Sequence, residues 1–175
     1  MTKGCYVVAL SCNPAPAVSR VVDILASGGV ILSPRYQGFA EVVEGLVDVL
    51  IDRGQLGPER RDEAIRAVCE RESLSSTVMV DIGVSIPHAR VRGVKGVIGA
   101  LAVSPDGVFQ AMAGVPIPIV VLVLSAPDLA GDHLNVLAGL SMLLQSEIVR
   151  SGVVAAADER AAIEVLRVHG ARRGV

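Results

Sequence analysis

Residue types that can carry out phosphoryl transfer lie close together in residues 71–90. His88 follows Pro87 directly. A neutral imidazole nitrogen can attack phosphorus, because its ordinary pKa of ~6.5 lies near physiological pH. Arg71 and Arg90 flank this histidine, and the planar arginine fork matches the oxygens of a phosphoryl group. Proline fixes its own φ and lacks an N–H, so we expect Pro87 to end regular strand pairing and to present His88 from a stiff backbone. A plain loop histidine is the alternative interpretation.

A second histidine, His133, follows Gly131 and Asp132 at the predicted start of a helix. Its imidazole could donate a hydrogen bond to an anion, and the amides of the helix N-terminus could add to it. Taken alone, His133 would be interpreted as a surface residue where a helix begins. Arg71 also has a second interpretation, as a cationic cap at the C-terminus of a helix, and the two roles are compatible. We interpret the third histidine, His169, as solvated.

Apolar periodicity indicates one α/β domain around these residues, with strands in the middle of the chain and helices at both ends. Only 2% of the 175 residues are aromatic, so the core must consist of Val, Leu, Ile and Ala, which favours layered α/β packing. There is no internal repeat or linker, and this length suits a single domain. Helical spacing is predicted over 18–25, 39–51, 64–69, 134–149 and 159–168, and β-rich runs cover 30–32, 77–80, 96–103 and 117–124.

Composition excludes several classes of function. The net charge is −2 and no segment clusters Lys and Arg strongly enough to suggest a nucleic-acid surface, so we expect no nucleic-acid partner. Cys5, Cys12 and Cys69 have neither the number nor the spacing of a disulfide framework or a zinc site, which suggests a reducing cytoplasm. The best apolar run, Ile117–Leu124, covers less than half of the ~20 residues that cross a membrane, so no membrane insertion is expected. Residues 1–12 are interpreted as an N-terminal strand or extension rather than a signal peptide.

The stretch Arg71–Arg90, RESLSSTVMVDIGVSIPHAR, resembles the active-site region of bacterial phosphotransferase-system enzyme IIA domains of the mannitol/fructose type. That family carries an Arg-Glu pair, a Ser-Thr a few residues on, and then Gly-x-x-x-Pro-His. Residues 131–144, GDHLNVLAGLSMLL, are similar to its second-histidine helix, and the resemblance runs from about residue 18 to residue 168. The chain departs from the family in having Val78-Met79-Val80 where relatives place glycines, and in lacking two carboxylates within 110–114.

The resemblance implies an α/β fold of the mannitol-type enzyme IIA kind, a single-domain mixed β-sheet flanked by helices. It implies that His88 is the phosphoryl acceptor and that Arg71 and His133 lie beside it. It implies no cofactor and no metal. The expected boundaries are an N-terminal extension over 1–16, the enzyme IIA domain over 17–170 and a tail over 171–175.

By this resemblance the chain would be a phosphocarrier. His88 would accept a phosphoryl group from the phosphorylated histidine carrier protein and pass it to a cysteine of an enzyme IIB in sugar uptake. No IIB-like or membrane IIC segment follows, so these partners would be separate chains. Cys69, on an apolar helix face, is expected in the core rather than as an acceptor. The alternative is a nitrogen-type regulatory enzyme IIA, in which the same phosphohistidine changes how the chain binds other proteins. A binding domain without phosphorylation is disfavoured, because Arg71, His88 and His133 are all present.

Overall fold

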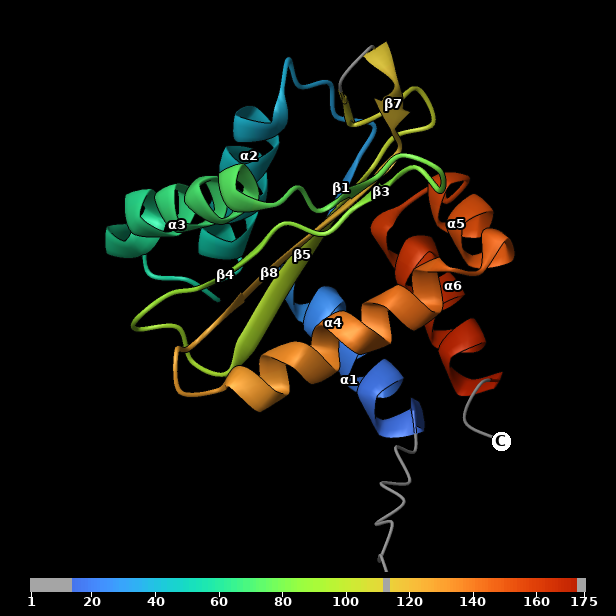
Figure 1. Cartoon of the computed structure of the whole chain (residues 1–175). Coiled ribbons are helices and arrows are strands. Elements are labelled where there is room, and N and C mark those ends of the chain that lie inside the picture. The colour runs from blue at the N-terminus through green and yellow to red at the C-terminus, as the bar shows by residue number, and fades with distance from the viewer. Residues whose placement is uncertain (1–13, 112–113, 173–175) are drawn as a thin grey trace, which may run out of the picture.

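Helices cover both faces of a mixed β-sheet in the computed structural model, which describes residues 14–111 and 114–172 (Figure 1). This arrangement confirms the predicted fold class. The helices are α1 (Pro14–Gly28), α2 (Phe39–Asp52), the short 3-10 turn η1 (Pro58–Arg60), α3 (Arg61–Leu74), α4 (Ala130–Leu144), α5 (Glu147–Val154) and α6 (Glu159–Arg172). The strands are β1 (Val30–Leu32), β2 (Val78–Met79), β3 (Val84–Ser85), β4 (His88–Arg90), β5 (Val97–Val103), β6 (Phe109–Gln110), β7 (Pro116–Ile117) and β8 (Ile119–Ser125).

The antiparallel pair β5 and β8 forms the centre of the sheet. Its register runs from Val97 opposite Ser125 to Val103 opposite Ile119. Strand β1 joins β5 in parallel, whereas β3 and β4 both pair in parallel with the other edge of β8. Strand β2 is antiparallel to β3, and β6 and β7 form a separate two-stranded ribbon. The sheet therefore places β4, which carries His88, directly beside β8.

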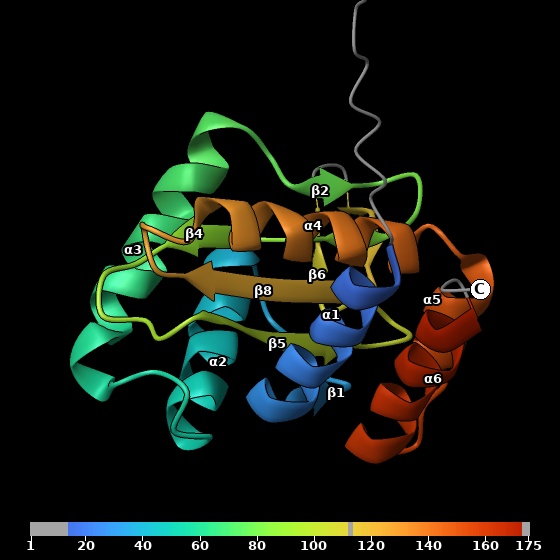
Figure 2. The same ribbon diagram turned by 90° about the horizontal axis from the view of Figure 1, so that it is seen from below.

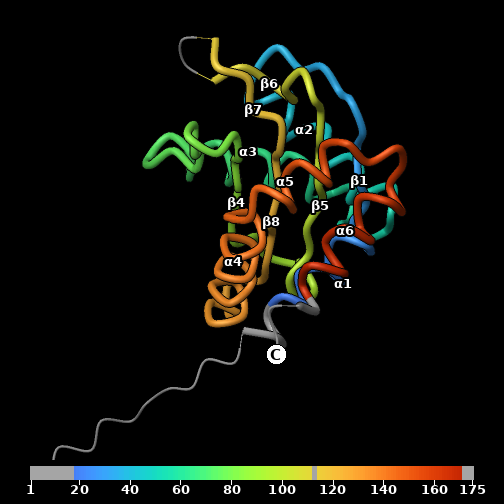
Figure 3. Tube along the Cα trace, turned by 90° about the vertical axis from the view of Figure 1, so that its right-hand side faces the viewer, coloured from blue at the N-terminus to red at the C-terminus, as the bar shows by residue number. Residues whose placement is uncertain are grey.

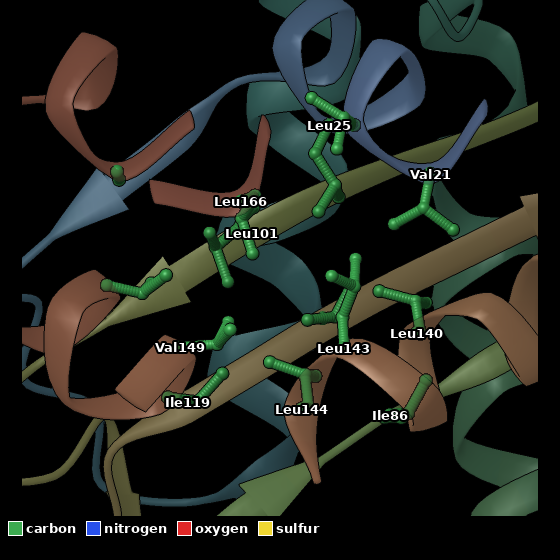
Figure 4. Close-up of a cluster of buried hydrophobic side chains, with 14 of the residues drawn as sticks. Val21, Leu25, Ile86, Leu101, Ile119, Leu140, Leu143, Leu144, Val149 and Leu166 are labelled. Carbon is green, nitrogen blue, oxygen red and sulfur yellow. The ribbon is translucent and has the colours of Figure 1, made fainter. Parts of the chain in front are cut away.

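Both faces of the central pair are buried, because every residue of β5 and β8 is covered. Side chains alternate along a strand, so odd-numbered residues such as Leu101 face α1, α4, α5 and α6, whereas even-numbered ones such as Leu122 face α2 and α3. Figure 2 shows α1 and α4 on the near side of the sheet, and the side chains of this layer meet in Figure 4. Helices α1, α4, α5 and α6 lie over the sheet in Figure 3. This double coverage explains the continuous aliphatic runs of the two strands.

The apolar run predicted as a strand over 117–124 is divided by a proline. Ile117 pairs within the ribbon of β6 and β7. Pro118 has no backbone N–H to donate to a neighbouring strand, and β8 begins at Ile119. Both prolines of this region therefore lie outside the central strand, Pro116 in β7 and Pro118 directly before β8.

The expectation that Pro87 ends regular pairing is wrong. Strands β3 and β4 pair with the same edge of β8, and only Ile86 and Pro87 lie between them. Pro87 cannot donate a hydrogen bond, but its carbonyl oxygen accepts one from the Val123 amide at 3.0 Å. Pairing then resumes at His88. This histidine is therefore a half-buried strand residue rather than an exposed loop residue.

The single helix predicted over 134–149 is two helices. α4 ends at Leu144 and α5 begins at Glu147, after Ser146 in extended backbone with φ −75° and ψ 119°. Arg150 of α5 stabilises this break, because its Nη1 donates to the carbonyl oxygens of Leu144 at 2.7 Å and Gln145 at 2.9 Å. Apolar spacing continues across the break, so periodicity alone could not reveal it.

Most of the expected N-terminal extension and tail lies outside the described residues. α1 begins at Pro14 and α6 continues to Arg172, each inside the range that was expected to flank the domain. His169 lies in α6 and is half-buried, so the interpretation of this residue as solvated is corrected. Within the part of the chain that the structure describes, none of the helices combines the length and the apolar character needed to cross a membrane.

Gly28, the last residue of α1, allows the helix to approach β5 closely. A Cβ atom at this position would overlap the carbonyl oxygen of Gly99. We expect Gly28→Ala to lower the free energy of unfolding by about 2–3 kcal/mol, because backbone atoms must move apart. Gly131→Ala is the matched control, since a Cβ there has no heavy atom within 4 Å. Urea unfolding of both variants tests this, and equal stabilities would contradict a close-packing constraint at Gly28.

Candidate functional site

A pocket of about 210 Å³ opens where the end of α3, strand β4 and the start of α4 meet. Three residues that the sequence motifs singled out, Arg71, His88 and His133, all line it, although 62 positions separate the first from the last. The complete lining is Arg71, His88, Ala89, Arg90, Ala130, His133, Leu134 and Leu137. No carboxylate is among these residues, so the pocket suits an anion.

His88 is held in one tautomer by the backbone two residues before it. Its Nδ1 lies 2.8 Å from the carbonyl oxygen of Ile86. A carbonyl oxygen can only accept, so in the neutral ring Nδ1 carries the proton and Nε2 keeps a free lone pair. Pro87 stiffens the link between the two partners, which lowers the entropy lost in orienting the ring. The result is an imidazole with its nucleophilic nitrogen on the side of the ring away from the backbone anchor.

His133 lies in the first turn of α4 and is only 6% exposed. Its ring centroid is 5.4 Å from that of His88, with an angle of 56° between the ring planes. Its Nδ1 lies 2.8 Å from the hydroxyl oxygen of Ser125, the last residue of β8. Sequence reasoning placed His133 where its helix begins, but α4 begins at Ala130. The amide of His133 already donates to the carbonyl oxygen of Leu129 at 2.9 Å, so only its side chain is available to the pocket.

The pKa of His133 is lowered to about 4. Burial of the imidazole is the main cause, because it disfavours the charged form, and electrostatic repulsion from the neighbouring His88 and Arg90 side chains adds to it. His133 is therefore neutral at pH 7 and carries one proton, on either Nδ1 or Nε2.

Arg71 lies in the last turn of α3, and its Nη1 donates to the carbonyl oxygen of Ser75 at 3.0 Å. The predicted role as a cap at the helix C-terminus is thus confirmed. A guanidinium has five N–H donors, and this contact uses one of them. The remaining donors leave Arg71 able to bind an anion in the pocket while it caps the helix.

Glu72 fastens the segment that follows α3. Its carboxylate accepts hydrogen bonds from the Ser76 hydroxyl at 2.7 Å, the Thr77 amide at 2.8 Å and the Thr77 hydroxyl at 2.7 Å. The Thr77 hydroxyl also lies 3.3 Å from that of Ser85, a fully buried residue of β3. Glu72 and the Ser-Thr pair of the sequence motif therefore belong to one network, which joins the end of α3 to the sheet beside Arg71.

Arg90 was an early candidate from the sequence and lines the pocket with the other three residues. It follows His88 by two positions in β4, so the two side chains share one face of the sheet. Asp132, next to His133 in the chain, forms an ion pair at 2.9 Å with Arg20 of α1. That carboxylate therefore does not offset the positive charge of the pocket.

Ser125 was not identified from the sequence, although it is fully buried and contacts His133. The available signal was a hydroxyl at the end of an otherwise aliphatic run, just before Ala126 and Pro127. Cys69 lies half-buried in α3, and burial raises the pKa of its thiol, which keeps it protonated. Across the described ranges, no group of three or more His, Cys, Asp or Glu side chains is placed to hold a metal ion.

Comparison with known proteins defines the class to which this fold and pocket belong. Residues 23–168 match the family described as phosphoenolpyruvate-dependent sugar phosphotransferase system, EIIA 2. The chain belongs to this family, the type-2 enzyme IIA domains. A fructose-specific EIIA component from Haloferax volcanii is 34% identical over 125 residues, which cover 71% of this chain and 79% of the relative. A nitrogen regulatory protein from Bradyrhizobium diazoefficiens is 27% identical over 124 residues, which cover 70% of this chain and 80% of that relative.

Solved structures share the fold. The nitrogen regulatory protein IIA-Ntr from Neisseria meningitidis has a TM-score of 0.70 at 23% identity, over 84% of this chain and 99% of that one. Enzyme IIAMTL from Escherichia coli, solved in complex with phosphorylated enzyme IIBMTL, has a TM-score of 0.64 at 18% identity, over 82% of this chain and 96% of that one. These similarities confirm the fold expected from the sequence motifs.

The low pKa of His133 makes stability depend on pH. Below about pH 6.5 the unfolded chain binds a proton at this residue that the folded chain excludes until about pH 4. The wild-type chain should therefore lose on the order of 2–3 kcal/mol of unfolding free energy from this group as pH falls across that range. His133→Gln, which cannot titrate, should show a shallower decline in urea unfolding at pH 7, 6 and 5. Parallel curves for the two proteins would contradict the buried neutral state.

Proposed function

We propose that the chain is a phosphocarrier and that His88 is its phosphoryl acceptor. The observation that carries this proposal is the composition of the pocket. It holds a half-buried imidazole with its Nε2 lone pair free, two arginines and a neutral second imidazole, with no carboxylate in the lining. The phosphoryl donor would be the phosphorylated histidine carrier protein. The acceptor would be a cysteine of an enzyme IIB on a separate chain, with the exchange taking place in the cytoplasm.

The transfer step follows from the tautomer of His88. The Nε2 lone pair attacks the phosphorus of the donor, the Nε2–P bond forms, and the donor N–P bond breaks with its electron pair returning to the donor imidazole. The His88 ring gains positive charge, which the Ile86 carbonyl stabilises through the Nδ1–H. In the second step a cysteine thiolate attacks the same phosphorus, the S–P bond forms, and the electron pair of the Nε2–P bond returns to His88. Because Nδ1 keeps its proton, His88 departs as a neutral imidazole.

The neighbouring side chains would stabilise the group in transit. Phosphoryl transfer requires mainly positioning and positive charge around the three oxygens of the transferred group. Arg71 and Arg90 supply that charge from α3 and β4, and His133 supplies an uncharged partner from α4. An uncharged donor binds phosphoryl oxygens without the strong attraction of a third cation, which favours onward transfer over retention.

The names of relatives support both of the expected functions. The fructose-specific EIIA component of Haloferax volcanii and the complex of enzyme IIAMTL with phosphorylated enzyme IIBMTL support transfer to an enzyme IIB. The nitrogen regulatory protein of Bradyrhizobium diazoefficiens supports the alternative, a regulatory enzyme IIA whose phosphorylation changes its binding to other proteins. Transfer from the phosphorylated chain to candidate IIB acceptors separates the two functions, since only the first requires it.

Incubation with phosphoenolpyruvate, enzyme I and the histidine carrier protein should attach an acid-labile phosphate to the wild-type chain. His88→Ala should remove the label, because the chain then lacks its acceptor nitrogen. His169→Ala is the matched control and should be labelled like wild type, since this histidine lies in α6 away from the pocket lining. Equal labelling of His88→Ala and wild type would overturn the assignment.

Arg71→Ala should slow phosphorylation of His88 by at least about tenfold while the chain remains folded, because a donor to the phosphoryl oxygens is lost. Arg71→Lys keeps the charge without the planar fork, so its phosphorylation rate should lie between those of the wild-type chain and Arg71→Ala. Arg66→Ala, on the same helix but exposed and outside the pocket lining, should transfer at the wild-type rate. Initial labelling rates, with circular dichroism to check folding, measure this. Equal rates for Arg71→Ala and Arg66→Ala would exclude Arg71 from the reaction.

A further inference from the structure

The hydroxyl of Ser125 is fixed in place behind His133. Ser125 is fully buried and ends β8, where its backbone pairs with Arg90 of β4 on one side and Val97 of β5 on the other. Its carbonyl oxygen also accepts a hydrogen bond from the Val91 amide at 2.8 Å. Strands on both sides therefore determine the position of the hydroxyl, and the 2.8 Å contact with the Nδ1 of His133 is set by the sheet.

The direction of this hydrogen bond follows from the surroundings of the hydroxyl. Among the described residues, His133 is the one hydrogen-bond partner of the Ser125 side chain. If Nδ1 carried a proton and donated it, the hydroxyl hydrogen would be buried without an acceptor, which costs about 1–3 kcal/mol. If the hydroxyl donates to Nδ1, both groups are satisfied. The second arrangement requires Nδ1 to be unprotonated, so the proton of the neutral His133 ring lies on Nε2.

We propose that Ser125 is a positioning residue that keeps His133 in the Nε2–H tautomer, as a hydrogen-bond donor to the phosphoryl group on His88. The choice of target rests on the function proposed above, whereas the tautomer itself does not. The two neighbouring imidazoles are then held in opposite tautomers by opposite groups. A carbonyl oxygen accepts from Nδ1 of His88, and a hydroxyl donates to Nδ1 of His133.

This difference assigns a separate role to each ring. His88 has a lone pair on its free nitrogen and can attack phosphorus. His133 has a proton on the corresponding nitrogen, so it can donate to an oxygen but cannot attack. Ser125 would therefore both strengthen the binding of the phosphoryl group and prevent His133 from competing for it.

Nuclear magnetic resonance of the full chain, labelled with ¹⁵N in its histidines, reads the tautomers directly at neutral pH. Protonated and unprotonated ring nitrogens resonate in separate ranges, so His133 should show an unprotonated Nδ1 and His88 an unprotonated Nε2. Ser125→Ala should move His133 toward a mixture of tautomers, and Ser125→Thr, which keeps the hydroxyl, should restore the wild-type spectrum. Ser104→Ala is the control, since this buried serine follows β5 at the opposite end of the β5–β8 pair. A proton on Nδ1 of His133 in the wild-type chain would overturn the proposal.

Phosphorylation rates test the consequence for transfer. Ser125→Ala should slow labelling of His88 by roughly tenfold, the lower end of the loss found when the hydrogen-bond partner that orients a metal-binding histidine is removed. Ser104→Ala should leave the rate unchanged. In a His133→Gln background, Ser125→Ala should have no further effect, because the glutamine amide donates without a tautomer to fix. An equal slowing in both backgrounds would show that Ser125 acts through stability alone. If wild-type His88 takes no label at all, the proposed function fails, and the resonance spectra still decide the tautomer.

Discussion

Strand β8 is paired along both edges, and the geometry of the pocket depends on that pairing. β5 lies antiparallel on one side over its whole length, and β3 and β4 follow one another on the other side. His88 is thereby aligned with Val123, and Ser125 is fixed two residues further along the same strand. The chain then turns into α4, which returns His133 to the Ser125 hydroxyl. The 5.4 Å separation of the two rings is thus a property of the sheet and of one short connection.

The pocket combines burial with positive charge, and both keep the imidazole of His133 in its neutral form. Burial disfavours a charged imidazole at His133, and the positive groups beside it add to this effect. Arg90, which would help to attract a phosphoryl group, therefore also helps to keep that imidazole neutral. Glu72, the acidic residue next to Arg71, is engaged by three hydrogen bonds from Ser76 and Thr77. These bonds hold the loop after α3 in place beside the site.

Much of this architecture follows from the sequence, because aliphatic runs bounded by prolines and glycines identify the central strands. Arg71, His88 and His133 were recognisable from two motifs. Three features depended on contacts through space and could not be predicted. Arg150 of α5 ends α4 through side-chain hydrogen bonds to the carbonyl oxygens of Leu144 and Gln145. Pro87 lies between β3 and β4 without disturbing their common register on β8, because its carbonyl, rather than its missing amide, faces that strand. Ser125 gains its role only through the path of the connection to α4.

The pocket draws its walls from opposite layers of the fold. Arg71 belongs to α3, which packs on the face of the sheet covered by α2, whereas His133 belongs to α4, which packs on the face covered by α1. The pocket lies at the edge where these layers meet, on either side of β4. An anion bound by both Arg71 and His133 would link α3 to α4 across the edge of the sheet. It would then oppose movement of one helix layer relative to the other. The phosphorylated and unphosphorylated forms of the chain would then differ in rigidity as well as in surface charge. A binding partner could distinguish them by either property.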